Sequence, residues 1–292
     1  MTRLSWVCWF ACWAGLGACA AAQDGEAVIR AEARLVEIPA TVLDHKGRYV
    51  DGLRAELFSV ADNGVAQRLV VFEGNDDGLS CAILLDTTAS MASALPNMKN
   101  AVLRMIEQMR EQDSVAVYGF DTSLRTLLNF TTDKRPAKAA VTRTRAAGAT
   151  ALFDAIAEAV REMSGRAGKK VLVVFTDGDD NSSVLNSNNA ILRARKEGIP
   201  IYTVAEGEAL HSKKLIEELT EISAVSGGLT YEIKKPHDAA KVFLDISEDM
   251  KHTYLLAYRP PEAGNKKWRT IYVAVSGKEK YSVRAREGYY PK

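Results

Sequence analysis

The sequence is poor in the residues that bind zinc or form disulfides, with four histidines and four cysteines among 292 residues. Three of the cysteines lie within the first 19 residues, which leaves Cys81 alone in the body of the chain. Cys81 is part of an apolar run, which is typical of a small buried side chain rather than of a reactive thiol. The histidines form no close pair of candidate zinc ligands along the chain; they are His45, His211, His237 and His252.

The chain also lacks an excess of charge of one sign. Its 38 Lys and Arg residues face 37 Asp and Glu residues, and the formal net charge is +1. A nearly neutral protein has no general electrostatic attraction for nucleic acid or for anionic membranes, although a local patch is compatible with this balance. With 47% hydrophobic and 26% charged residues, the composition is that of a folded protein, and the length suits one large domain or a medium domain with a smaller companion.

The first 22 residues have the pattern of a secretory signal. Residues 4–22 carry no charge, follow Arg3 and end in three alanines. This pattern predicts export to the periplasm, the envelope or the medium. Cleavage after Ala22 is one interpretation, and the other is processing at Leu-Gly-Ala-Cys, residues 16–19, which resembles a bacterial lipobox and would leave a lipidated Cys19. An uncleaved anchor is a third, because the stretch is marginally long enough to span a bilayer.

Both ends of the remaining chain have the pattern of short β-strands. Residues 28–72 contain short apolar runs separated by turn signals, and Asn63-Gly64 between two such runs is a strong indication of a β-hairpin. Similar runs occur at residues 254–258, 270–275 and 281–286. We therefore expect the two ends to pair into a small β-rich accessory unit.

The middle of the chain alternates between strand and helix patterns. Residues 81–85 and 170–175 are continuous apolar runs, as in parallel strands that are buried on both faces. Further strands are predicted at 114–120 and 199–204, and helices at 98–109, 152–163, 188–197, 211–225 and 238–250. This alternation predicts the α/β class, with a doubly wound, mostly parallel sheet. The predicted organisation is a signal at 1–22, a β-rich segment at 23–77, the α/β domain at 78–250 and a β-rich segment at 251–292.

Polar side chains follow two of the predicted parallel strands. Asp86, Thr88 and Ser90 come directly after the first apolar strand, and their spacing of two places their oxygens on one side of an extended loop. Asp177 follows the later strand, and Thr150 lies at the start of a predicted helix. Ligands of open α/β sheets bind at the carboxyl ends of the strands. Oxygen ligands of this kind suit a hard cation such as Mg²⁺.

These residues resemble the metal-ion-dependent adhesion site of von Willebrand factor A-type domains, whose usual first motif is Asp-x-Ser-x-Ser. The resemblance extends over about residues 78–250 in element order, and the flanking β segments look like those of bacterial secreted relatives of this family. Thr88 stands where Ser is usual, but it keeps the hydroxyl. The resemblance implies that Thr88 and Ser90 bind Mg²⁺ or Mn²⁺ directly, that Asp86 and Asp177 act largely through water or hydrogen bonds, and that Thr150 joins directly or through water.

Each of these residues also has a purely structural interpretation. Ser90 or Thr150 alone could cap the helix that follows, and Asp177 before a glycine is often part of a turn. Asp154, one turn into its predicted helix, could support the metal site or simply stabilise the helix start. The acidic loop that begins at Asp177 is expected to be a solvated rim, and the adjacent lysines 169 and 170 are expected to be solvated ends of a strand.

The sequence therefore predicts an exported, non-enzymatic module that binds Mg²⁺ or Mn²⁺ and uses the ion to capture an acidic group on a protein partner. One alternative is a metal-assisted hydrolase that acts through Asp86 or Asp177, for which no general base with a positioned partner is evident. Another is a scaffold whose metal site is vestigial and whose β-rich unit makes the contacts. The balanced charge predicts that nucleic acid is not a partner, and contact with a membrane is expected only through a lipid on Cys19.

Overall fold

The computed structural model of the protein describes residues 35–235, 238–261, 267–277 and 279–291. The predicted signal at 1–22 and the candidate lipidation site Cys19 lie outside the described residues, as does His237. The described residues belong to one compact unit. They form a six-stranded sheet with helices on both faces, together with two four-stranded sheets.

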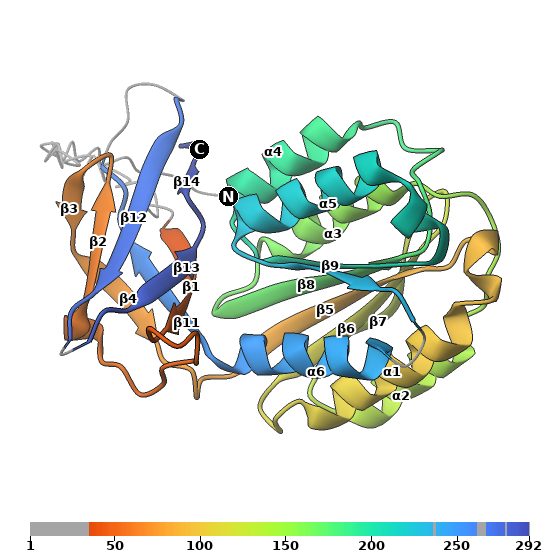
Figure 1. The fold of residues 1–292 in the computed structure, drawn as a ribbon, viewed down its shortest axis with the longest axis horizontal. Helices are drawn as coiled ribbons and strands as arrows, with labels where there is room; N and C mark the ends of the chain where they lie inside the picture. The colour runs from red at the N-terminus through yellow and green to blue at the C-terminus, as the bar shows by residue number, and fades with distance from the viewer. Residues whose placement is uncertain (1–34, 236–237, 262–266, 278, 292) are drawn as a thin grey trace, which may run out of the picture. The chain divides into compact units, whose positions relative to one another are not determined.

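The six-stranded sheet has the order β10-β9-β8-β5-β6-β7 (Figure 1). Five neighbouring strands are parallel and the edge strand β7 is antiparallel to β6. Every residue of β5 and β8 is buried, as the continuous apolar runs predicted. The strands are β5 (Leu79–Asp86), β6 (Ser114–Phe120), β7 (Leu124–Thr131), β8 (Lys169–Thr176), β9 (Ile201–Glu206) and β10 (Thr230–Ile233).

Helices cover the two faces of this sheet in groups of three. One face carries α3 (Leu152–Met163), α4 (Ser187–Glu197) and α5 (Lys213–Ser226), and the other carries α1 (Leu95–Gln108), α2 (Lys134–Arg143) and α6 (Asp238–Lys251) (Figure 1). Each group packs its apolar stripe on the sheet, so that two separate hydrophobic cores form. The prediction of a doubly wound α/β fold is confirmed.

The two ends of the chain pair with each other in two antiparallel sheets, as expected. One has the order β13-β1-β11-β4 and the other the order β14-β12-β2-β3. Their strands are β1 (Val36–Leu43), β2 (Phe58–Asp62), β3 (Val65–Gln67), β4 (Leu69–Glu73), β11 (Thr253–Tyr258), β12 (Arg269–Val275), β13 (Ser282–Ala285) and β14 (Gly288–Tyr289). Asn63 and Gly64 both have positive φ, at 48° and 80°, which is the geometry of the predicted tight hairpin between β2 and β3.

Three elements of the α/β unit were not predicted from the sequence: the edge strands β7 and β10, and helix α2. Strand β7 is only partly buried along its length, so it lacks the continuous apolar run that marks β5 and β8. Helix α2 has a proline in its first turn, and its start is marked by Asp133, whose side chain accepts a hydrogen bond from the amide of Arg135. Edge strands and short amphipathic helices give weaker sequence patterns because they bury less of their surface.

The expectation that the lysines at the start of β8 are solvated is wrong. Lys169 is 3% exposed, and its ammonium group donates to the carbonyl oxygens of Gly74 (2.8 Å) and Asn75 (3.2 Å). Lys170 is also buried, and its Nζ lies 2.6 Å from a carboxylate oxygen of Glu37 in β1. Both ammonium groups find partners in segments far away in the sequence, which compensates for their loss of hydration.

Arg286, just after β13, is a buried cation that closes the carboxyl end of α4. Its guanidinium donates to the carbonyl oxygen of Arg195 in the last turn of α4 and to that of Gly288. The partial negative charge at the carboxyl end of the helix favours a cation there. Gly198 ends α4 with a φ of 65°, and a Cβ at this position would lie 1.7 Å from Nη1 of Arg286. The glycine therefore provides both a left-handed conformation and the space for the arginine.

We predict that Gly198→Ala destabilises the protein much more than Gly47→Ala does. Gly47 has a similar φ of 75° but no atom within 4 Å of its would-be Cβ, so it isolates the cost of the left-handed backbone, about 1 kcal/mol. Displacing the buried guanidinium should add about 2 kcal/mol or more at Gly198. Urea unfolding of both variants measures the difference, and equal losses would show that Arg286 moves aside freely.

Candidate functional site

The candidate site lies at the carboxyl edge of the six-stranded sheet. Asp86 is the last residue of β5, and Asp177 follows the last residue of β8. These strands are adjacent and in register, with Leu85 opposite Phe175, so the two carboxylates emerge next to each other. Both are withdrawn from solvent, since Asp86 is 0% exposed and Asp177 is 4% exposed.

A chain of hydrogen bonds joins four of the five predicted site residues. The amide and the hydroxyl of Thr88 both donate to Oδ1 of Asp86, at 2.9 and 2.6 Å. The hydroxyls of Thr88 and Ser90 lie 3.0 Å apart, and Ser90 donates to Oδ1 of Asp177 at 2.9 Å. The sequence pattern thus selected side chains that do meet, although two of them are 87 residues apart along the chain.

Thr176 belongs to the same cluster but was not predicted from the sequence. Its hydroxyl donates to the second carboxylate oxygen of Asp86 at 2.8 Å. It is the last residue of β8 and directly precedes Asp177, so a hydroxyl at the end of the second strand is the signal that could have identified it. Thr176 fixes the orientation of the Asp86 carboxylate across the two strands.

The fifth predicted residue, Thr150, lies in a loop that runs beside the Asp86 segment. The amide of Ala147 donates to the carbonyl of Thr87 (2.7 Å), and the amide of Ala89 donates to the carbonyl of Gly148 (3.2 Å). Thr150 is buried, and its own amide donates to Oδ1 of Asn181 at 3.0 Å. In the described part of the chain, its hydroxyl is not a member of the hydrogen-bond chain formed by the other four residues.

The helix-capping interpretation of the two hydroxyls is wrong. Helix α1 begins after Ala94 and helix α3 after Ala151, so neither Ser90 nor Thr150 occupies the position that caps a helix. Ser90 lies instead within a short 3₁₀ helix, Ala89–Ala92, with its hydroxyl directed to Asp177. The hydroxyls of Ser90 and Thr150 are therefore not committed to helix starts.

Burial raises the pKa of both carboxyl groups. For Asp177 the pKa rises to about 6, because the group is desolvated and the negative charge of Asp86 is nearby, while the hydrogen bond from Ser90 opposes the rise. Burial also raises the pKa of Asp86, against the hydrogen bonds from Thr88 and Thr176. Within the described ranges, neither carboxylate forms an ion pair with Lys or Arg, and their partners are hydroxyls and amides. Two buried carboxylates without a counter-charge favour a bound cation.

The donor set fits a hard cation and does not fit zinc. All the side-chain atoms of the cluster that could coordinate a metal ion are oxygens, and those of Thr88 and Ser90 belong to neutral hydroxyl groups. Over the residues that the structure describes, no group of three or more His, Cys, Asp or Glu side chains is placed to hold a metal ion. A cation here would depend on the hydroxyls, as Mg²⁺ or Mn²⁺ sites built from oxygen ligands can.

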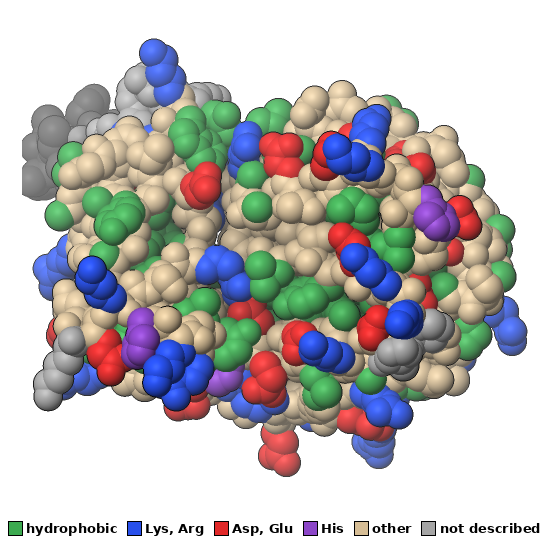
Figure 2. All heavy atoms as spheres, in the orientation of Figure 1, with side chains coloured by type: hydrophobic (Ala, Val, Ile, Leu, Met, Phe, Trp, Pro, Cys, Tyr) green, Lys and Arg blue, Asp and Glu red, His purple; other side chains and the backbone are tan. Residues whose placement is uncertain are grey.

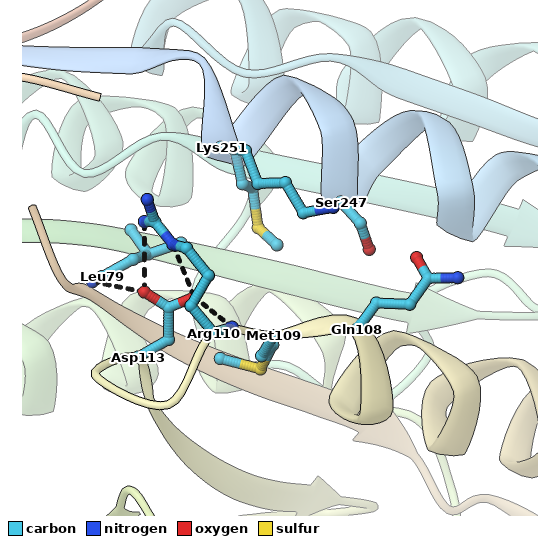
Figure 3. Close-up of a pocket in the computed structure, with 8 residues that line it drawn as sticks. Leu79, Gln108, Met109, Arg110, Asp113, Ser247 and Lys251 are labelled. Carbon is cyan, nitrogen blue, oxygen red and sulfur yellow. Dashed lines mark hydrogen bonds and ion pairs between the residues drawn. The ribbon is translucent and has the colours of Figure 1, made fainter. Parts of the chain in front are cut away.

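A small pocket elsewhere in the α/β unit is separate from this site. It is lined by Leu79, at the start of β5, by Arg110 and Asp113 before β6, and by Ser247 and Lys251 of α6 (Figure 3). These positions are at the amino edge of the sheet, whereas Asp86 and Asp177 are at the carboxyl edge. Arg110 and Asp113 are paired there at 3.2 Å.

Comparison with known proteins identifies relatives of the fold. The profile of the von Willebrand factor type A domain matches residues 81–243. A search of curated proteins gave no match. The chain is similar to a von Willebrand factor type A structure from Catenulispora acidiphila, with 14% identity and a TM-score of 0.53, over 90% of this chain and 76% of that one.

Two further solved structures are similar over a smaller part of this chain. Proximal thread matrix protein 1 from the mussel byssus has 18% identity and a TM-score of 0.53, over 66% of this chain and 51% of that one. A mutant of the PilB minor pilin from Streptococcus sanguinis has 16% identity and a TM-score of 0.50, over 60% of this chain and 62% of that one. Such identities establish a likeness of fold, and the match spans less than two thirds of both proteins.

We predict that Asp177→Asn stabilises the protein when divalent cations are removed by EDTA. The pKa of Asp177 is higher in the folded state, at about 6, than its ordinary value of 3.8, so the folded state binds the proton more tightly. Stability without cations should therefore fall as pH rises through about 4 to 6, and at pH 7 the variant should gain about 1–3 kcal/mol. Asparagine keeps an oxygen that can accept the hydrogen bond from Ser90.

Urea unfolding of the parent and of Asp177→Asn at pH 4, 5, 6 and 7, all in EDTA, measures this effect. A parent that is as stable as the variant at pH 7 would contradict the argument, because the ionised carboxylate would then carry no penalty.

Proposed function

Because the chain belongs to the von Willebrand factor type A domain family, we propose that it is an exported protein-interaction module that uses a bound Mg²⁺ or Mn²⁺ to capture an acidic group on a protein partner. Domains of this family mediate contacts between proteins. Asp86 and Asp177 lie at the carboxyl edge of the sheet, which is where ligands of α/β proteins bind, and this supports the proposal. The residues proposed to hold the ion are Asp86, Thr88, Ser90, Thr150 and Asp177.

One observation carries the proposal. Asp86 and Asp177 are both buried, lie in one hydrogen-bond chain with two hydroxyls, and have no basic partner in the described part of the protein. An arrangement of this kind is costly for a protein without a cation, since both carboxylates lose hydration and repel each other. A divalent ion held by the same oxygens would remove that cost.

The chemistry of the donors explains why such a site would bind a partner. Thr88 and Ser90 would contribute neutral oxygens to the ion, while Asp86 is held by Thr88 and Thr176 and supports them by hydrogen bonds. A bound Mg²⁺ supplies a coordination position for an incoming carboxylate, and a shell rich in hydroxyls leaves the charge of the ion poorly neutralised. The proposed role is therefore adhesion or assembly without turnover.

The distribution of charge agrees with a protein partner. On the face shown in Figure 2, acidic and basic side chains are interspersed, as expected from the balanced composition. The proposal therefore includes no nucleic acid. The specificity would come from the metal-bound acidic group and from the surface around it rather than from long-range attraction.

Export is part of the proposal and is based on residues 1–22. Two of the structures that share the fold are a minor pilin and a matrix protein of the mussel byssus, both named after structures outside the cell. None of the helices in the described part of the chain is both long and apolar enough to cross a membrane. The pattern of residues 16–19 is the basis for proposing that attachment to a membrane is through a lipid on Cys19.

We predict that Asp86→Ala abolishes binding of Mg²⁺ while the domain stays folded. Asp86 lies at the carboxyl edge of the sheet, and the core is formed by the apolar residues that precede it in β5 and by those of the neighbouring strands. Asp179→Ala is the matched control, because Asp179 is an exposed acid two residues after Asp177 and takes no part in the hydrogen-bond chain. Calorimetric titration with Mg²⁺ and circular dichroism of each variant measure the two properties. If folded Asp86→Ala kept the Mg²⁺ affinity of the parent, the assignment of the metal site to Asp86 and its neighbours would be wrong.

We predict that Cys19→Ser moves the protein from the membrane fraction to the soluble fraction of its native envelope if residues 16–19 direct lipidation. A serine cannot form the thioether to the lipid, whereas the rest of the signal is unchanged. Fractionation and sequencing of the mature amino terminus distinguish the two processing routes. An unchanged distribution with a first residue at Gln23 would favour ordinary secretion.

A further inference from the structure

A third buried carboxylate lies at the edge of the sheet that carries Asp86 and Asp177. Glu206 is the last residue of β9, which runs parallel to β8 with Ala205 opposite Thr176. The next residues along the two strands are Glu206 and Asp177, so they leave the sheet side by side and on the same face. Three adjacent strands, β5, β8 and β9, therefore each end in an acid or directly before one (Figure 1).

The segment after β9 is fixed against Asp177. The amide of Ala209 donates to the carbonyl oxygen of Asp177 at 2.7 Å. Gly207 has a φ of 61°, and a Cβ at this position would lie 3.4 Å from Cβ of Asp177. Burial raises the pKa of Glu206, and the negative charge of Asp177 adds to the rise. The two carboxylates therefore belong to one region of the sheet edge.

The carboxylate of Glu206 is withdrawn from water without gaining a partner. The residue is 8% exposed, and its Oε2 is buried and accepts no hydrogen bond within the ranges that the structure describes. None of the ion pairs among those residues includes Glu206. A buried carboxylate that has neither a donor nor a counter-charge is costly, and a nearby cation would compensate that cost.

Two other acids near the site do have partners. The carboxylate of Asp180 accepts hydrogen bonds from the amides of Phe153 (2.9 Å) and Ser183 (3.0 Å). That of Asp154 accepts from two backbone amides of the loop after β8, at 2.8 and 2.9 Å. The expectation of a solvated acidic rim is thus wrong for Asp180, and Asp154 acts by shaping this loop. Glu206 differs from both, because no described donor compensates its burial.

The three acids at the strand ends are not placed to bind one ion together. Among the residues that the structure describes, no group of three or more His, Cys, Asp or Glu side chains could hold a metal ion. Glu206 can therefore act on an ion in the candidate site only at longer range, through its charge and through a water molecule bound to the ion. Mg²⁺ suits this arrangement, because it usually keeps several of its waters when it binds to a protein.

We propose that Glu206 is a positioning residue of the cation site, whose ionised carboxylate strengthens the binding of Mg²⁺ without touching the ion. The proposal rests on the proposed function and adds a residue that the sequence pattern of the site does not contain. Carboxylates that hold the groups bound to a metal ion raise its affinity. A third negative charge also leaves less positive charge for the acid of a partner, so Glu206 favours occupancy by the ion over the strength of capture.

The first test is calorimetric titration of the full protein with Mg²⁺. Glu206→Gln removes the charge and keeps the shape, and it should bind Mg²⁺ about tenfold more weakly than the parent. Glu206→Asp keeps the charge and should stay within about threefold of the parent. Glu208→Gln is the matched control, because the side chain of this neighbouring acid is 82% exposed and solvent screens its charge. The control should change the affinity by less than about twofold.

Unfolding by urea at pH 8 in EDTA separates the effect of charge from a loss of structure. Glu206→Gln should be more stable than the parent, since it removes an uncompensated buried charge. Asp177→Asn should also be more stable, and the double variant should gain less than the sum of the two, because either substitution alone relieves the repulsion between the pair. A carboxylate with a merely structural role would show neither the gain nor this coupling.

The outcomes distinguish this inference from the proposed function. If the parent binds Mg²⁺ and Glu206→Gln binds it equally well, the inference is wrong and the proposed metal site stands. Equal losses of affinity in Glu206→Gln and Glu206→Asp would also overturn it, because the charge would then not be the property that matters. If the parent binds no Mg²⁺, the proposed metal site and this inference fail together.

Discussion

The structure of the site depends on one constraint, the parallel pairing of β5 with β8 in a fixed register. Parallel neighbours end at the same edge of a sheet, so a polar residue after one strand necessarily meets a polar residue after the other. Here that rule brings the carboxylates of Asp86 and Asp177 together in a place where both are buried. Every other feature of the site, from Thr176 to the hydroxyls of Thr88 and Ser90, contributes oxygens or donors around these two groups.

The hydrogen bonds of the site do not stop at the candidate metal ligands. They continue through the backbone of Thr150 to Asn181, and from the same loop through Asp180 and Asp154 to the first turn of α3. Asp180 and Asp154, which are not candidate metal ligands, thus hold the loop beside the candidate site. The acidic residues of this edge divide into two groups, one that faces the site and one that shapes the loop beside it.

Two buried cations connect the α/β unit to the segments of the accessory sheets at positions away from the site. Lys169, at the amino end of β8, is bound by carbonyl groups of the segment before β5, and Arg286 closes the end of α4. Both cations are deeply desolvated, and burial lowers the pKa of Lys169 to about 8. The connections made by Lys169 lie at the amino edge of the sheet, so they leave its carboxyl edge to the candidate site.

The sequence by itself determined the class of fold and most members of the site. Continuous apolar runs mark strands that are buried on both faces, and the motif of Asp86, Thr88 and Ser90 with Asp177 lies at strand ends, where topology alone brings residues together. Only the tertiary structure decided the burial of Lys169 and Glu206 and the roles of Thr176 and Asp154. Whether a polar group is buried, or an apolar one exposed, depends on partners supplied by distant segments. The local sequence pattern does not identify those partners.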